Sequence, residues 1–495
     1  ATLTYSNSFG RHFVNLALGA NLRENKSSGE SMVATGFTND RFTSIGFANS
    51  YKENSSPYST SSKERLFGTF LSANYSFDNR YLLDLSVRAD GSSKFGSDNK
   101  VAPFWALGIG WNLHHEKALQ AVGVLSQLRL KANTGLTGAV SFTPYMANTL
   151  YEYYKDNWYS TGVGAIVDQY GNENLKWQRT RNYDIGLDLG FLDDRFFVSG
   201  RYYYKLTQDM LTDVTLPPST GFSYYKENLG DIRNQGYELN LKLQAVKQTD
   251  FTVAVFGNFT HNRNKLVKIS NSLKKLNEKA DESQLEDEYK GTPLLRYNEG
   301  LSMNTIYAVR SLGIDPENGK ELFITKEGQL THDWNVADIV PICDASPDLE
   351  GFFGGNIYYK GFLLNFSFYT RFGGYEYNQT LVDRVENADP RYNVDRRAFK
   401  YRWANPGDVA RFKDIADLGS TQVTQRFIEK DNVLELKSVY LSYDFSPAIA
   451  KKLFMKSLRA SVTLNDLWRT SSIAIERGID YPFARNFIFS LQTTF

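Results

Sequence analysis

Long segments in which apolar and polar residues alternate one by one constrain this chain more than any other feature. Between Gly361 and Gly373, Phe and Leu residues occupy alternate positions on one side, and polar residues occupy the positions between them. Because successive side chains of a β-strand point to opposite faces of a sheet, this alternation predicts a strand with one apolar and one polar face. The same pattern recurs at 127–137, 182–191, 195–207 and 236–246. We therefore expect an all-β chain.

Strand length separates the two kinds of all-β protein that show such alternation, a soluble sandwich and a membrane barrel. The alternating segments run for about 9–15 residues, whereas strands of soluble proteins average about 5–6. Their apolar faces are rich in aromatic residues, and the chain holds 34 Phe and 31 Tyr. Mean hydropathy is negative, which a barrel permits because only one face of each strand is apolar. The pattern predicts a transmembrane antiparallel β-barrel.

The connections between the predicted strands alternate between short and long. Short turns fall at 9–10, 78–79, 193–194, 249–250 and 360–361, and long polar stretches at 25–62, 138–174, 212–234, 265–300, 326–347 and 374–432. Two intermediate connections, 113–125 and 446–456, are predicted as short amphipathic turns on the side of the short turns. Short periplasmic turns and long outer loops are typical of bacterial outer-membrane barrels.

The number of strands indicates that a part of the barrel is missing from this chain. We count about 17 strands, with 301–314 and 320–325 the weakest patterns, and bacterial single-chain barrels have an even number. The chain starts within a strand pattern, Thr2–Ser8, and shows no signal peptide. We therefore expect residues 1–495 to be the C-terminal portion of a larger protein.

Composition excludes several other classes of function. The net charge of +1 gives no strong field for nucleic acid. The single Cys343 excludes an intrachain disulfide or a cysteine metal cluster. The mixed charges at 274–290 are expected to be a solvated face, and His114-His115 a solvated pair, so no metal or cofactor is predicted. The five histidines form no recognisable nucleophile–base arrangement, so no catalytic residue is predicted.

Several segments spread along the whole chain resemble one known family. They are DGSSKFGSDNKVAPFWALGIGWNL (90–113), LRLKANTGLTG (128–138), NENLKWQRTRNYDIGLDLGFLDDRFFVSGRYYYKLTQDML (172–211), NLGDIRNQGYELNL (228–241), RFIEKDNVLELKSVYLSYDFS (426–446) and YPFARNFIFSLQTTF (481–495). Together with Lys360-Gly361-Phe362, they are similar to the SusC/RagA type of TonB-dependent outer-membrane transporters of Bacteroidetes. Barrels of such transporters have about 22 strands, so about five strands and the plug domain are expected outside this chain.

The resemblance implies partners and an activity. A SusD-like surface lipoprotein would cover the outer mouth, and TonB would supply energy through the missing N-terminal part, which is either a second chain or a cleaved piece. The imported substrate would be an oligosaccharide or an oligopeptide, and membrane lipid would surround the barrel. Two alternatives stay open: an outer-membrane barrel enzyme such as a protease or lipase, and a passive structural barrel.

Two sets of residues are candidates for specific roles. Tyr153, Tyr154, Trp158 and Tyr159 cluster in a predicted outer loop, and aromatic residues exposed in a loop often mark a binding surface. They are expected to contact either the ligand or the lid protein, and their interleaving with polar residues favours an oligosaccharide. The second set is Phe487, Phe489 and Phe495 in the last predicted strand. The resemblance implies that this terminal aromatic strand is the signal read by the barrel-assembly machinery.

Overall fold

A single large antiparallel sheet dominates the computed structural model. The structure describes residues 1–41, 43–53, 55, 57–96, 99–140, 142–160, 162–169, 171–215, 224–228, 230–269, 271–474 and 485–495, with the backbone alone described at 154–159, 212–215, 224–226 and 271–272. Within these ranges the sheet has 15 strands. They are β1 (Thr2–Phe9), β2 (His12–Ser31), β5 (Tyr58–Phe77), β6 (Tyr81–Ser92), β7 (Val101–Asn112), β8 (Leu125–Ala139), β11 (Gln178–Phe191), β12 (Phe196–Gln208), β15 (Asp231–Lys247), β16 (Phe251–Lys268), β21 (Leu349–Tyr359), β22 (Phe362–Tyr377), β23 (Ile428–Asp444), β24 (Ser457–Ser471) and β25 (Asn486–Thr494).

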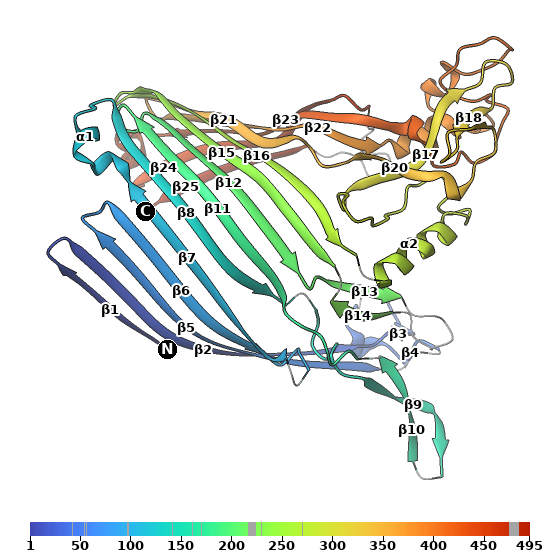
Figure 1. Cartoon of the computed structure of the whole chain (residues 1–495), viewed down its shortest axis with the longest axis horizontal. Helices are drawn as coiled ribbons and strands as arrows, with labels where there is room; N and C mark the ends of the chain where they lie inside the picture. Colours follow the sequence, from blue (N-terminus) through green and yellow to red (C-terminus); the bar gives the residue numbers. More distant parts are fainter. Residues whose placement is uncertain are drawn as a thin grey trace.

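Within this sheet, each strand pairs with the sheet strand that follows it in the sequence, from β1 at one edge to β25 at the other. Figure 1 shows the short turns, helix α1 (Lys117–Gln120) and the C-terminus at one end of the curved sheet, and the long connections at the other end. Helix α4 (Pro447–Lys452) lies in the second intermediate connection, between β23 and β24. The alternation of short and long connections is therefore confirmed.

Turn chemistry explains the tight hairpins. Between β21 and β22, Tyr359 pairs with Phe362, so only Lys360 and Gly361 form the turn. Both have positive φ, 44° and 94°, as a two-residue type I′ turn requires. Asp78 and Asn79, between β5 and β6, also have positive φ, which Asn and Asp tolerate better than most residues.

The two faces of the sheet differ as the alternation predicts. On β15, Tyr237, Leu239 and Leu243 share the apolar face, and their side chains are exposed. The neighbouring strands continue this face, because Tyr237 pairs with Tyr202 of β12 and with His261 of β16. A continuous exposed apolar face of this size requires a lipid environment.

The structure corrects three of the expectations. The segments 301–314 and 320–325 are not strands of the large sheet. They contain β17 (Thr305–Ile314) and β18 (Glu321–Ile324), which form a separate four-stranded sheet with β19 (Leu330–Thr331) and β20 (Ile339–Asp344). The predicted loop 25–62 is shorter than expected, because β2 continues to Ser31 and β5 already begins at Tyr58.

The third correction concerns the predicted aromatic loop, which is a hairpin of β9 (Leu150–Tyr159) and β10 (Gly162–Gln169). Its alternation is interrupted by a register shift between Val163 and Gly164, and this irregularity hides it in the sequence. Other long connections hold β3 (Ala34–Thr35) with β4 (Ser50–Tyr51), β13 (Leu211–Thr215) with β14 (Tyr224–Asn228), and helices α2 (Asn271–Ser283) and α3 (Gln379–Leu381). Among the residues described, no helix is both long and apolar enough to cross a membrane.

Candidate functional site at the outer rim

The long connections around β17–β20 fold against residues 378–427 into a unit that we call the loop assembly. Its core consists of buried side chains from β17, the end of β22, the turn after α3 and the segment before β23: Ala308, Tyr377, Leu381, Val382, Val385, Phe412, Val423 and Phe427. These residues are far apart in the sequence, so their packing joins two separate connections into one body.

A buried ion triad reinforces this core. The Arg426 guanidinium donates to Glu386 at 2.6 Å and to Glu321 of β18 at 2.9 Å. Burial by itself lowers the pKa of Arg426, but the carboxylates of Glu321 and Glu386 outweigh it and raise the pKa above its ordinary value. The Arg402 guanidinium nearby donates to the carbonyl oxygens of Val385, Glu386, Ala398 and Lys413. The loop assembly is therefore held in one arrangement by both packing and charge.

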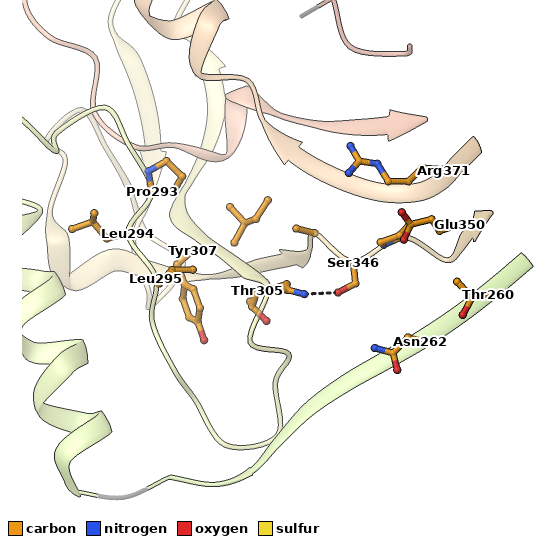
Figure 2. A pocket seen from close by; sticks show the side chains of 14 residues that line it. Thr260, Asn262, Pro293, Leu294, Leu295, Thr305, Tyr307, Ser346, Glu350 and Arg371 are labelled. Carbon is orange, nitrogen blue, oxygen red and sulfur yellow. Dashed lines mark hydrogen bonds between the residues drawn. The ribbon is translucent and has the colours of Figure 1, made fainter. Parts of the chain in front are cut away.

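A pocket of about 520 Å³ lies where the loop assembly meets the polar face of the large sheet. It is lined by Thr260, Asn262, Pro293, Leu294, Leu295, Asn304, Thr305, Ile306, Tyr307, Ala345, Ser346, Pro347, Glu350 and Arg371. Figure 2 shows Thr260, Asn262 and Glu350 on one side of the pocket and Pro293, Leu294 and Leu295 on the other. One side is thus polar and belongs to the strands, and the other is largely apolar and belongs to the connections.

Two opposite charges face the pocket from neighbouring strands. Glu350 of β21 and Arg371 of β22 are cross-strand partners. The Tyr369 hydroxyl donates to Glu350 at 2.6 Å. Arg371 forms an ion pair with the buried Asp431 and lies 3.7 Å from Glu376. These contacts fix both side chains before any ligand arrives, which lowers the entropy lost on binding.

Amide and hydroxyl groups complete the polar side. The Asn262 Oδ1 atom accepts from the Tyr203 hydroxyl at 3.0 Å, and its Nδ2 atom donates to Asn234 at 3.2 Å. Across the pocket, Asn304 Nδ2 donates to Ser346 Oγ at 3.1 Å, the bond drawn in Figure 2. The pocket therefore offers oriented donors and acceptors together with apolar surface, which is the composition of a non-covalent binding site.

The aromatic cluster predicted from the sequence is not part of this pocket. In Figure 1 the β9–β10 hairpin projects from the rim well away from β17–β20. Tyr153 is 71% exposed. The side chains of Tyr154, Trp158 and Tyr159 lie outside the described residues, so their contact with a ligand or a lid stays a prediction.

The predicted terminal strand is present as β25. Phe487 and Phe489 lie on the apolar face opposite Leu464 and Val462 of β24, and both are exposed. Phe495 follows the end of the strand and is 73% exposed. Their position agrees with the alternation, and their role in assembly stays a prediction.

The alternation between Gly361 and Gly373 predicts a polar face for Arg371 without giving it a role, and no sequence pattern points to Asn262 or Glu350. Alternation indicates which face a residue occupies, but not which residues of that face a connection covers. No local signal links 293–295 or 345–347 to β16 and β21. Among the residues described, no group of three or more His, Cys, Asp or Glu side chains could hold a metal ion.

Comparison with known proteins gives relatives of one kind. The chain is 26% identical over 486 residues to the TonB-dependent receptor P3 of Formosa agariphila, covering 94% of this chain and 47% of that protein. It is 29% identical over 465 residues to the TonB-dependent receptor SusC of Bacteroides thetaiotaomicron, covering 88% of this chain and 44% of that protein. The chain thus spans about half the length of the curated relatives that it matches.

A solved structure and a family model agree with these relatives. The structure of the RagAB peptide transporter matches all of this chain and 55% of its own chain, with a TM-score of 0.84 at 23% identity, which shows a shared fold. The sequence model of the family described as TonB dependent receptor-like, beta-barrel matches residues 1–305, more than half of the chain. The chain therefore belongs to the β-barrel family of TonB-dependent receptors, which are outer-membrane proteins.

Proposed function

We propose that this chain is the C-terminal barrel portion of an importer that takes up oligosaccharides or oligopeptides across the outer membrane with energy from TonB. The observation that carries the proposal is the pocket of about 520 Å³, which we call the rim pocket. It lies on the polar face of the large sheet, at the end that carries the long connections. In a closed barrel the polar face lines the lumen. A ligand in this pocket is therefore at the outer mouth of a transport path.

The remaining parts of the importer follow from the open sheet and from the family. Within the described part of the chain, the sheet ends at β1 and β25, which each pair on one side only. The first strands and a plug from an N-terminal part of the same transporter would close the wall and fill the lumen. A SusD-like surface lipoprotein would cover the mouth, where the loop assembly offers a rigid rim. TonB would act through the N-terminal part.

The lining of the rim pocket supports an oligopeptide more than an oligosaccharide. It combines Leu294, Leu295 and two prolines with Glu350, Arg371 and amide groups, so it matches the mixed side chains and backbone groups of a peptide. Tyr307 is the aromatic residue of the lining, and it is only 2% exposed. It therefore presents little ring surface on which a sugar could stack. The aromatic β9–β10 hairpin, which lies away from this pocket, would favour an oligosaccharide.

An enzymatic function has weaker support. His332 and Asp315 form a pair with Nε2 3.2 Å from Oδ2, which resembles part of a hydrolase triad. However, the other ring nitrogen of His332 contacts the Glu321 carbonyl oxygen at 3.1 Å. Both nitrogens are thus engaged, and neither is left to accept a proton from a nucleophile. Transport through a passive barrel would need no energy source, whereas uptake by the proposed importer depends on TonB.

Uptake by intact cells tests the proposal. Cells that lack the gene of the complete protein should lose uptake of a labelled oligopeptide or oligosaccharide pool, and a plasmid copy should restore it. Dissipating the proton gradient with an uncoupler should stop the restored uptake, because TonB requires that gradient. Uptake that survives the uncoupler would show a passive barrel, and cleavage of the pool outside the cell without uptake would show an enzyme.

Mass spectrometry of material extracted from the purified native complex decides the substrate class. We expect a mixture of short peptides. Recovery of glycans without peptides would reject the oligopeptide and favour the hairpin as the determinant of specificity.

A further inference from the structure

Four basic residues lie on the apolar face of the sheet, close to its outer rim, with Leu206 of β12 between the first of them and the other three. They are Arg181 of β11, Arg233 of β15, and Arg263 and Lys265 of β16, and we call them the basic row. The register connects them, because Arg181 pairs with Leu206 of β12, Leu206 pairs with Arg233, and Arg233 pairs with Lys265. Arg263 lies two residues before Lys265, nearer the middle of β16, and pairs with Gln235. All four therefore share the face that carries Tyr237 and Leu239.

The basic row lies just beyond the apolar band. On β16 this band begins at Phe251, after the short turn, and ends at His261, ten residues further along. At about 3.4 Å per residue and a tilt of about 40°, ten residues rise about 26 Å, which matches the apolar band of an outer-membrane barrel at about 25 Å. His261 stacks on Tyr237 with ring centroids 4.9 Å apart, as in an interfacial aromatic girdle. Arg263 and Lys265 thus lie at the height of the outer headgroups.

The basic row has no carboxylate partners in the described part of the chain. None of its four side chains lies within salt-bridge distance of a described Asp or Glu, and Arg233 Nε is buried without a hydrogen-bond partner. Two other cations of these strands are paired with carboxylates. On the same face, Arg179 pairs with Asp209 at 2.6 Å, and on the polar face Arg201 pairs with Glu238 at 2.9 Å. The basic row therefore keeps its charge available for an anion.

Three members of the basic row line a recess of about 530 Å³. Arg233, Arg263 and Lys265 line it together with Gln235, Asn264, Thr305, the connection at 300–302 and residues 341–344 of β20. Asp344 is the one acidic residue of the lining, so the recess keeps an excess of positive charge. Loop backbone and basic side chains around a recess at headgroup height provide a site for a charged headgroup, whose oxygens accept from several donors at once.

We propose that the basic row binds the phosphorylated headgroup of a glycolipid of the outer leaflet. The phosphate would accept from Arg233, Arg263 and Lys265 in the recess, and the acyl chains would lie along the exposed apolar face below, against Tyr237 and Leu239. A free phosphate ion would use the same cations but would gain nothing from that apolar face. The position of the basic row directly above the band therefore favours the lipid.

Binding of a purified phosphorylated glycolipid to the complete transporter in mild detergent, followed by native mass spectrometry, tests the inference. The variant Arg233→Gln/Lys265→Gln removes two charges from the recess. Each basic group near a lipid headgroup contributes about a fivefold gain in affinity, so the loss of two groups should lower the affinity about thirtyfold. The same glycolipid after enzymatic removal of its phosphates should bind the unchanged protein as weakly as the intact glycolipid binds the variant.

The control variant is Lys205→Gln/Lys242→Gln, which removes two charges from the polar face of β12 and β15. It should bind the glycolipid as the unchanged protein does, and heat-modifiable migration on gels should show that both variants are folded. Equal affinity of the two variants, or equal binding of the dephosphorylated glycolipid, would overturn the proposal. Displacement of the glycolipid by millimolar inorganic phosphate would also overturn it, because the site would then be one for the free ion.

Discussion

Leu241 and Lys242 are neighbours in β15 whose side chains lie on opposite faces of the sheet. Leu241 pairs with Val198 and Gly257 on the apolar face, and Lys242 pairs with Phe197 and Phe256 on the polar face. Leu241→Arg should lower the free energy of unfolding by about 2–4 kcal/mol, because an arginine near the membrane midplane loses its hydration. Lys242→Leu should change it little. Urea unfolding in lipid vesicles measures both, and a reversed order would place the register of β15 wrong by one residue.

Cys343 in β20 offers a prediction on reactivity. Burial, with a smaller effect of the Asp344 carboxylate, raises the pKa of the Cys343 thiol to about 11. Only the thiolate reacts with alkylating reagents, so at pH 8 labelling should be about a hundredfold slower than for a thiol with an ordinary pKa. The rate should rise with pH up to about the raised pKa. Leu330→Cys in a Cys343→Ser background provides an exposed control, and similar labelling of both thiols at pH 8 would contradict the burial of Cys343.

The candidate site shows which contacts a local sequence pattern can predict and which it cannot. The polar face of β22, including Arg371, follows from alternation alone, because that pattern is local. The convergence of Arg371 with Asn262 and Leu294 depends on how the connections fold back over the sheet. Such contacts are set by packing between segments that are distant in the sequence, and no period or composition in one segment encodes them.

At the scale of elements, alternation identified strands better than it identified their partners. The segments at 127–137, 182–191, 195–207, 236–246 and 361–373 lie in strands of the large sheet, except for Arg195 and Gly361 in the turns before β12 and β22. The segments 301–314 and 320–325, the weakest patterns, belong to a separate sheet. Strand pairing, which no local pattern encodes, distinguishes the barrel wall from a sheet formed by the connections.

The ion triad joins two elements of the loop assembly, so its removal should loosen both. Arg426→Met removes the ion-pair partner of the buried Glu386 and Glu321 carboxylates, and breaking such a pair costs about 3–5 kcal/mol. Hydrogen exchange should become faster at the backbone amides of Val382–Glu386 and of β18. Arg391→Gln, which removes an exposed ion pair with Asp389, serves as the control and should leave both segments protected. Unchanged protection in Arg426→Met would show that apolar packing alone holds the assembly.

The terminal strand β25 provides a prediction on assembly. Deletion of Phe495 should reduce the amount of folded barrel in the outer membrane, because the exposed aromatic terminus is the proposed recognition element of the assembly machinery. Transport per assembled molecule should not change. Heat-modifiable migration of membrane extracts measures the folded fraction, with Phe495→Tyr as a variant that keeps the aromatic ring. Full assembly of the deletion variant would exclude a signal role for Phe495.

At the scale of the whole molecule, the open sheet predicts a partner. Among the strands that the structure describes, none lies beside the outer edges of β1 and β25, and each backbone group left unpaired costs several kcal/mol in lipid. Further strands, from another part of the same protein or from another chain, should therefore pair with β1 and β25 in the outer membrane, and cross-linking at these two edges would detect them. Isolation of this chain alone as a stable closed barrel would contradict the prediction.

The neighbour-to-neighbour order of the strands has a consequence for how such proteins diversify. Every long connection between strands of the large sheet joins two strands that are already adjacent, so its ends are held together whatever it contains. Doubling the length of a flexible connection then costs only about 0.6 kcal/mol. Insertions that build new rim structures, such as β17–β20 or the β9–β10 hairpin, can therefore accumulate without disturbing the wall. The same barrel wall can in this way carry connections that bind new ligands as the family evolves.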